Sequence, residues 1–169
     1  MNAHPLPPIL SIVAKSGSGK TTFIEKLLPE LNRRGLRVGV LKHHGHATPF
    51  DMPGKDTFRH FAAGAEVVVG ASAAQVAVFR RQNGAEDLEG VIAQHMADLD
   101  LVLTEGYKRG PHPKIEVHRA ARSGELLCDP ADLLALVSDT PFAIPTPQFG
   151  LEEAAAVADF LVAWLQARA

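Results

Sequence analysis

The sequence predicts an α/β domain of the P-loop NTPase type, with three layers around a mostly parallel sheet. Strand-like and helix-like segments alternate along the chain, as they do in βαβ units. The apolar, β-branched run at 9–13 leads into residues 14–21, AKSGSGKT, which match the Walker A pattern with Ala14 in place of the first glycine. Apolar residues at helical spacing follow. Strand, loop and helix in this order are the context in which the pattern binds phosphate.

The residues of this loop suit a nucleotide polyphosphate with Mg²⁺. Gly17 and Gly19 carry no side chain, so the backbone N–H groups of residues 17–21 can surround an anion. Lys20 brings a positive charge to the β- and γ-phosphates, and the Thr21 hydroxyl is a ligand for Mg²⁺. The expected nucleotide-binding residues of the loop are Lys15, Ser16, Gly17, Ser18, Gly19, Lys20, Thr21 and Thr22.

The periodicity of apolar residues indicates where the other elements lie. Strands are expected at 8–13, 37–41, 66–70, 75–80, 99–104, 114–118, 133–137 and 142–144, and helices at 20–34, 55–63, 86–97 and 151–167. The runs 66–70 and 75–80 predict a hairpin at an antiparallel edge, which leaves a surface for strand addition or dimerisation. Pro29 predicts a kink in the first helix. The length of 169 residues predicts one nucleotide-binding domain over 1–169.

The composition excludes several classes of partner. The formal net charge is -2 and there is no basic block, so we expect no nucleic-acid partner. No uninterrupted apolar stretch is long enough to cross a bilayer, so we expect no membrane span. The single cysteine, Cys128, excludes an internal disulfide and fits a cytoplasmic protein.

Further site residues are expected where strands end, because ligands bind at the carboxyl ends of parallel strands. Lys42 follows one apolar strand and Glu105 another. Glu105 has the position of a Walker B carboxylate near Mg²⁺ or its water shell; the alternative is an acid facing solvent. Asp139 follows a later strand and is a candidate to accept hydrogen bonds from guanine, which would favour GTP, or else forms an Asx turn before Pro141.

The loop at 42–54 leaves two questions open. Asp51 and Asp56 either reach the metal as switch residues or, in the case of Asp56, add charge at the start of a helix. The histidines of this region suit Zn, Ni or Cu, but no cysteine accompanies them and their spacing matches no structural zinc pattern. They are His43, His44, His46 and His60.

Several motifs together resemble the molybdopterin-guanine dinucleotide biosynthesis protein B (MobB) family. They are SGSGKTT at 16–22, LKH at 41–43, DMPGKD at 51–56, AGA at 63–65, DLVLTEGYK at 100–108 and VSD at 137–139. The resemblance implies a small cytosolic homodimer that binds GTP with Mg²⁺ and hydrolyses it weakly. It also implies a role beside the MobA-type guanylyltransferase, where GMP is attached to molybdopterin to form the guanine dinucleotide.

Lys15 occupies a position that is often another residue in the family that the chain resembles. A lysine here resembles the Walker loop of the ParA and nitrogenase iron protein lineage, where it reaches phosphates across a dimer; the alternative is a solvated loop lysine. Two other functions compete with a GTP-binding accessory protein. One is a metallochaperone-type GTPase that uses the His-rich loop, and the other is an ATP-dependent small-molecule kinase. No residue is an obvious general base, which fits slow hydrolysis assisted by Lys20 and Glu105.

Overall fold

The computed structural model describes residues 6–44, 49–82 and 87–168, which fall into two compact units. The first unit comprises Met1–His43 and Glu89–Ala169, and the second comprises His44–Leu88. A single nucleotide-binding domain over the whole chain stays a prediction.

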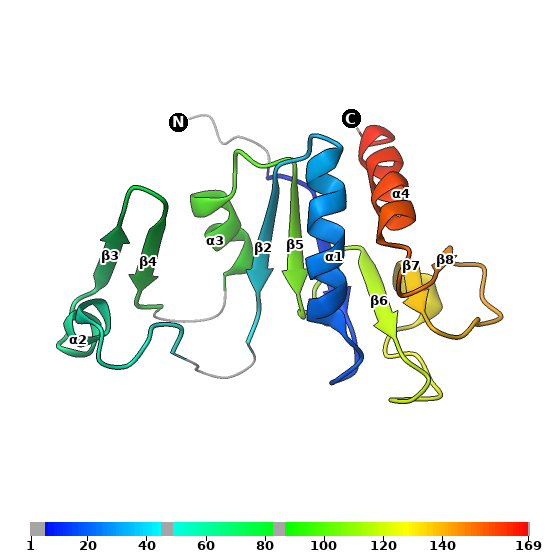
Figure 1. The fold of residues 1–169 in the computed structure, drawn as a ribbon, viewed down its shortest axis with the longest axis horizontal. Helices are drawn as coiled ribbons and strands as arrows, with labels where there is room; N and C mark the ends of the chain where they lie inside the picture. Colours follow the sequence, from blue (N-terminus) through cyan, green and yellow to red (C-terminus); the bar gives the residue numbers. More distant parts are fainter. Residues whose placement is uncertain (1–5, 45–48, 83–86, 169) are drawn as a thin grey trace. The chain divides into compact units, whose positions relative to one another are not determined.

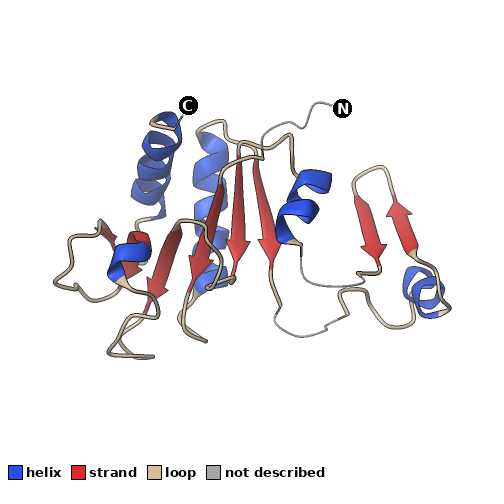
Figure 2. Ribbon diagram, turned by 180° about the vertical axis from the view of Figure 1, so that it is seen from behind, coloured by secondary structure: helices blue, strands red, loops and turns tan. Residues whose placement is uncertain are grey.

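The first unit is built on a six-stranded sheet in the order β2-β5-β1-β6-β7-β8, and every neighbouring pair is parallel. Figure 2 shows these strands side by side. Their bounds are β1 Ile9–Val13, β2 Val38–Lys42, β5 Leu101–Glu105, β6 Lys114–His118, β7 Leu133–Ser138 and β8 Gln148–Phe149. A 3-10 turn, η1, at Pro130–Asp132 precedes β7. The predicted parallel sheet is therefore confirmed.

The strand expected at 142–144 is wrong, because the last strand of the sheet lies at 148–149. The side-chain amide of Gln148 bonds both backbone groups of Phe142, accepting from its N–H at 2.9 Å and donating to its carbonyl at 2.7 Å. Pro145 and Pro147 lie between Phe142 and Gln148 and have no N–H to donate to a neighbouring strand. The segment is thus tied to the sheet through a side chain.

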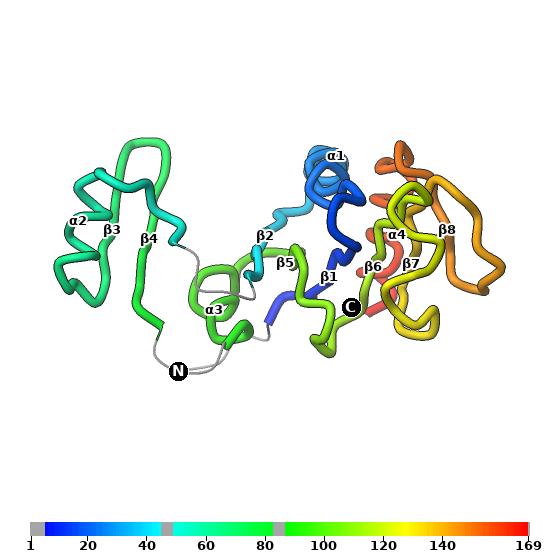
Figure 3. The backbone as a smooth tube through the Cα atoms, turned by 90° about the horizontal axis from the view of Figure 1, so that it is seen from below, coloured from blue at the N-terminus to red at the C-terminus, as the bar shows by residue number. Residues whose placement is uncertain are grey.

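Helices cover both faces of this sheet, which confirms the three layers. Helix α1 (Lys20–Arg33) packs with α4 (Ala154–Gln166), and α3 (Leu88–His95) lies on the opposite face, as Figures 1 and 3 show. Strands that are covered on both faces consist mainly of apolar residues, and β1 and β5 are buried along their whole length. The helix α1 runs on through Pro29, which is exposed.

The core of the first unit lies between the sheet and the α1–α4 layer. Its largest side chains are fully buried and come from both the strands and the helices. They include Leu10, Ile12, Leu27, Leu31, Leu101, Leu103, Ile115 and Leu161. On the described residues no helix has the length and apolar character that a membrane span needs.

The second unit consists of α2 (Asp56–Ala62) and the antiparallel pair β3 (Val67–Ala71) and β4 (Val76–Arg80). The predicted hairpin is confirmed, and within the described residues its strands pair only with each other, forming a two-stranded sheet of their own. Arg81 holds the helix to the hairpin, since its guanidinium donates to the carbonyls of Ala65 and Phe61 and lies 4.5 Å from the centre of the Phe61 ring.

Candidate nucleotide-binding site

The loop between β1 and α1 has the backbone that an anion site needs. Gly17 and Gly19 have φ values of 77° and 89°, a left-handed conformation that is easy only for glycine. The Ser18 N–H donates to the Lys15 carbonyl at 3.2 Å, and the Phe23 N–H donates to the Gly19 carbonyl at 2.9 Å, where the helix starts. Gly19 caps α1 without a side chain, and the first turn holds no acid. The unpaired N–H groups and positive dipole end of α1 therefore face no competing carboxylate of that turn.

Two of the residues predicted at strand ends, Lys42 and Glu105, meet Thr21 of the Walker loop. The Thr21 hydroxyl donates to Glu105 Oε1 at 2.6 Å, and Lys42 Nζ lies 3.7 Å from Glu105 Oε2. The register explains the meeting, because Lys42 pairs with Glu105 across β2 and β5, and Ile12 pairs with Glu105 across β1 and β5. Glu105 is only 8% exposed, so the alternative of an acid facing solvent is wrong.

The donors around Thr21 fit Mg²⁺. Magnesium prefers oxygen ligands, keeps several waters and takes only one or two carboxylates from a protein. A hydroxyl and a carboxylate held 2.6 Å apart at the start of a helix meet that requirement. Across the described residues no group of three or more His, Cys, Asp or Glu side chains is arranged to hold a metal. A site with one carboxylate and one hydroxyl, completed by water, is compatible with that finding.

Asp51, the third predicted metal ligand, belongs to the second unit. Its Oδ1 accepts from the Met52 N–H at 2.8 Å, whereas its Oδ2 is buried and has no hydrogen-bond partner among the described residues. A buried carboxylate oxygen without a donor is unusual and is a natural ligand for a cation. The metal role of Asp51 nevertheless stays a prediction.

Asp139, the predicted reader of the guanine base, is exposed at the end of β7. Its Oδ1 accepts from the Ala120 N–H at 2.8 Å. The turn before Pro141 is stabilised by the neighbouring Ser138, whose hydroxyl accepts from the Thr140 N–H at 3.1 Å. Asp139 thus holds the loop that follows β6, and its role in reading a base stays a prediction.

That loop carries two functional candidates that sequence reasoning missed. Arg119 Nε donates to the Ser18 carbonyl, and Arg122 Nε donates to the Gly17 carbonyl, both at 3.2 Å. Lys15 Nζ donates to the Ser123 hydroxyl of the same loop. The strand-end rule identifies these residues, because they follow β6 directly at the edge where the Walker loop lies.

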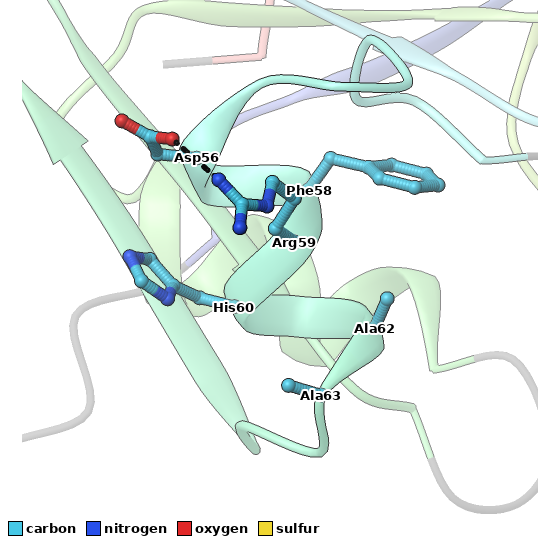
Figure 4. A pocket seen from close by; sticks show the side chains of 6 residues that line it. All are labelled: Asp56, Phe58, Arg59, His60, Ala62 and Ala63. Atoms are coloured by element: carbon cyan, nitrogen blue, oxygen red, sulfur yellow. Dashed lines mark ion pairs between the residues drawn. The ribbon is translucent and has the colours of Figure 1, made fainter.

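The second unit holds His44, Asp56 and His60, whereas His43 belongs to the first unit. Figure 4 shows an open hollow on α2 lined by Asp56, Phe58, Arg59, His60, Ala62 and Ala63. The carboxylate of Asp56 lies at the start of α2, 3.6 Å from the Arg59 guanidinium, as expected for a charge at a helix start. The His44 ring contacts the Phe50 ring at a centroid distance of 5.2 Å. His46 lies outside the described residues.

A parallel sheet with a Walker loop after its central strand and a buried acid at the end of the neighbouring strand defines a P-loop NTPase-type domain. The sequence model of the family described as Molybdopterin guanine dinucleotide synthesis protein B (MobB) matches residues 9–139. The chain belongs to this family, which confirms the resemblance that its motifs indicate.

Comparisons with individual proteins agree with this family assignment. The chain is 36% identical over 172 residues to the molybdopterin-guanine dinucleotide biosynthesis adapter protein of Escherichia coli K12, with 98% of each chain covered. It is 37% identical to the adapter protein of Haemophilus influenzae, with 94% of this chain and 89% of the relative covered. Among solved structures, a molybdopterin-guanine biosynthesis protein B is similar at a TM-score of 0.73 and 32% identity, covering 94% of this chain and 99% of that one. Bacillus subtilis MobB is similar at a TM-score of 0.71 and 28% identity, covering 92% and 96% respectively.

Proposed function

We propose that this protein is a GTP-binding adapter of molybdopterin guanine dinucleotide biosynthesis, with weak Mg²⁺-dependent GTPase activity. The contact between the Thr21 hydroxyl and the buried Glu105 carboxylate carries the proposal, since it brings two oxygen ligands for Mg²⁺ to the helix start where phosphates bind. Membership of the MobB family and the printed names of the relatives supply the pathway.

The residues of the site have different roles in this proposal. The amides of residues 17–21 and the Lys20 ammonium hold the phosphates. Thr21 and Glu105 would hold Mg²⁺ directly or through water, and the ion would supply positive charge at the phosphates. Glu105 is already engaged by Thr21 and lies 3.7 Å from the Lys42 ammonium, so it is poorly suited to take a proton from water. Hydrolysis without a general base is expected to be slow.

Calorimetric titration with GTP, GDP and ATP, each with Mg²⁺ and with EDTA, tests the proposal. We expect tightest binding of GTP with Mg²⁺. Lys20→Ala is expected to lose binding, and Lys26→Ala is the matched control, because Lys26 lies on the same helix and pairs with the exposed Glu152. A clear preference for ATP would favour the small-molecule kinase, and binding of no nucleotide would exclude a nucleotide-dependent role.

We further propose that the protein acts as a homodimer and binds a MobA-type guanylyltransferase and molybdopterin or its guanine dinucleotide. The dimer proposal is supported by apolar side chains that the hairpin leaves exposed. Val69, Val76 and Val78 are 57%, 66% and 42% exposed. A two-stranded sheet is marginal alone and gains from further pairing.

Sedimentation analysis of Val76→Glu tests the dimer, with Val91→Glu as the control. Val91 is also an exposed apolar residue, but it lies on α3 outside the hairpin. We expect monomers only for Val76→Glu. A dimer that survives this change, or that Val91→Glu also dissociates, would contradict the assignment of the interface to the hairpin.

A further inference from the structure

The loop after β6 places two guanidinium groups against the two glycines of the Walker loop. A Cβ at Gly17 would lie 3.1 Å from Arg122 Cζ, and a Cβ at Gly19 would lie 3.3 Å from Arg119 Nε. Side chains at these glycines would therefore displace the arginines as well as strain the backbone, whose φ is positive at both. The glycines make room for the guanidinium groups on one side of the loop.

Each arginine uses only part of its hydrogen-bonding capacity on the protein. A guanidinium has five N–H donors in a planar fork. The Nε of each donates to a loop carbonyl, and within the described residues no acceptor is found for the terminal nitrogens of Arg119 or Arg122. Neither guanidinium forms an ion pair with a carboxylate of that part of the chain.

The loop that carries them is held firmly in place. The buried His118 ring bridges the Ser138 hydroxyl at 3.0 Å and the Ser123 carbonyl at 2.9 Å. Asp139 accepts from the Ala120 N–H, and the backbone N–H groups of Arg122 and Ser123 donate to the Arg119 carbonyl at 2.9 and 3.2 Å. These bonds fix the backbone from which both arginine side chains extend, so little ordering of the loop backbone is needed on binding.

Two positive charges without a close ion-pair partner among the described residues, carried on an ordered loop next to a phosphate-binding backbone, match a polyphosphate. We propose that Arg119 and Arg122 bind phosphate oxygens of the nucleotide from the same chain, through their terminal nitrogens, while Nε holds the Walker loop. The inference rests on the proposed nucleotide-binding function and adds to it a second set of phosphate ligands beyond Lys20 and the loop amides. Arginine suits this position because its fork serves a carbonyl and an anion at once, which a lysine head does with less geometric definition.

Binding of Mg²⁺–GTP and of inorganic tripolyphosphate to the full chain tests the proposal, with Arg119→Gln, Arg122→Gln and Arg33→Gln compared with wild type. Arg33→Gln is the matched control, because this substitution removes the same charge at the far end of α1. At 1.5 Å per residue, Arg33 lies about 20 Å along the helix from Lys20. We expect Arg119→Gln and Arg122→Gln each to lower the affinity for both ligands about tenfold. Arg33→Gln is expected to bind as wild type does, and Arg119→Lys to fall between Gln and wild type.

The melting temperature of the nucleotide-free protein separates a phosphate ligand from a residue that only supports the loop. We expect it to stay within about 2 °C of wild type in both loop variants, while the shift produced by GTP shrinks. Unchanged affinities in both variants would overturn the proposal, as would losses of affinity matched by a fall of more than about 5 °C in the nucleotide-free protein. Wild type that binds neither ligand would instead refute the proposed function itself.

Discussion

Glu116 is buried in the middle of β6, and its removal should measurably destabilise the first unit. The side chain is 1% exposed, and its carboxylate accepts from the Leu127 N–H at 2.6 Å and the Cys128 N–H at 3.0 Å. The two bonds hold the segment before η1 against the sheet. Alanine at this position leaves both N–H groups without an acceptor.

The magnitude follows from those two bonds. A buried donor left unpaired costs about 1–3 kcal/mol, so two cost at most about 2–6 kcal/mol here, because Leu127 and Cys128 are only half-buried. The folded state no longer bears the desolvation of a carboxylate, which offsets part of this loss. We therefore expect Glu116→Ala to lower the free energy of unfolding by about 2–3 kcal/mol. Glu116→Gln keeps one acceptor oxygen and the volume, so about half that loss is expected.

Urea unfolding followed by circular dichroism measures these differences, provided that the m-value stays constant. Glu125→Ala is the control, because Glu125 is exposed and its described hydrogen bonds come from its backbone. If Glu116→Ala is no less stable than Glu125→Ala, the two hydrogen bonds do not hold the segment and the reasoning fails.

Three further outcomes are expected. Burial, together with the nearby Glu116 charge, raises the pKa of the Cys128 thiol. Iodoacetamide should therefore react with Cys128 far more slowly in the folded protein than in the urea-unfolded chain, and equal rates would contradict this. Burial lowers the pKa of His112 below 6.5, so the unfolded chain binds more protons just below that pH, and the free energy of unfolding should fall as pH drops through this range. That fall should be smaller in His112→Asn, as denaturation at several pH values would show. Glu105→Gln should reduce the Mg²⁺-dependent gain in GTP affinity about tenfold but leave binding in EDTA unchanged, and an unaltered gain would remove Glu105 from the metal site.

Much of the fold was predictable because its signals are local. A strand, a glycine-rich loop and an apolar helix stripe each arise from neighbouring residues, so β1, the Walker loop and α1 were assigned within a residue or two. The expected strand at 142–144 fails for a local reason that the apolar pattern does not reveal. Gln148, six residues further on, bonds the backbone of Phe142, and Pro145 and Pro147 have no N–H to donate to a ladder. The hairpin at 67–80 was equally clear, but no local pattern could show that its strands form a separate sheet.

By itself, the sequence determined the class of domain, the phosphate-binding loop, the acids and bases at strand ends, and the family. Tertiary structure decided which of them meet. Thr21 and Glu105 are 84 residues apart and come within 2.6 Å because β1 and β5 pair in a particular register. Arg119 and Arg122 reach the Walker loop, more than a hundred positions away, because β6 pairs with the other side of β1. Strand order depends on long-range burial and pairing energies, and no short window of residues contains them.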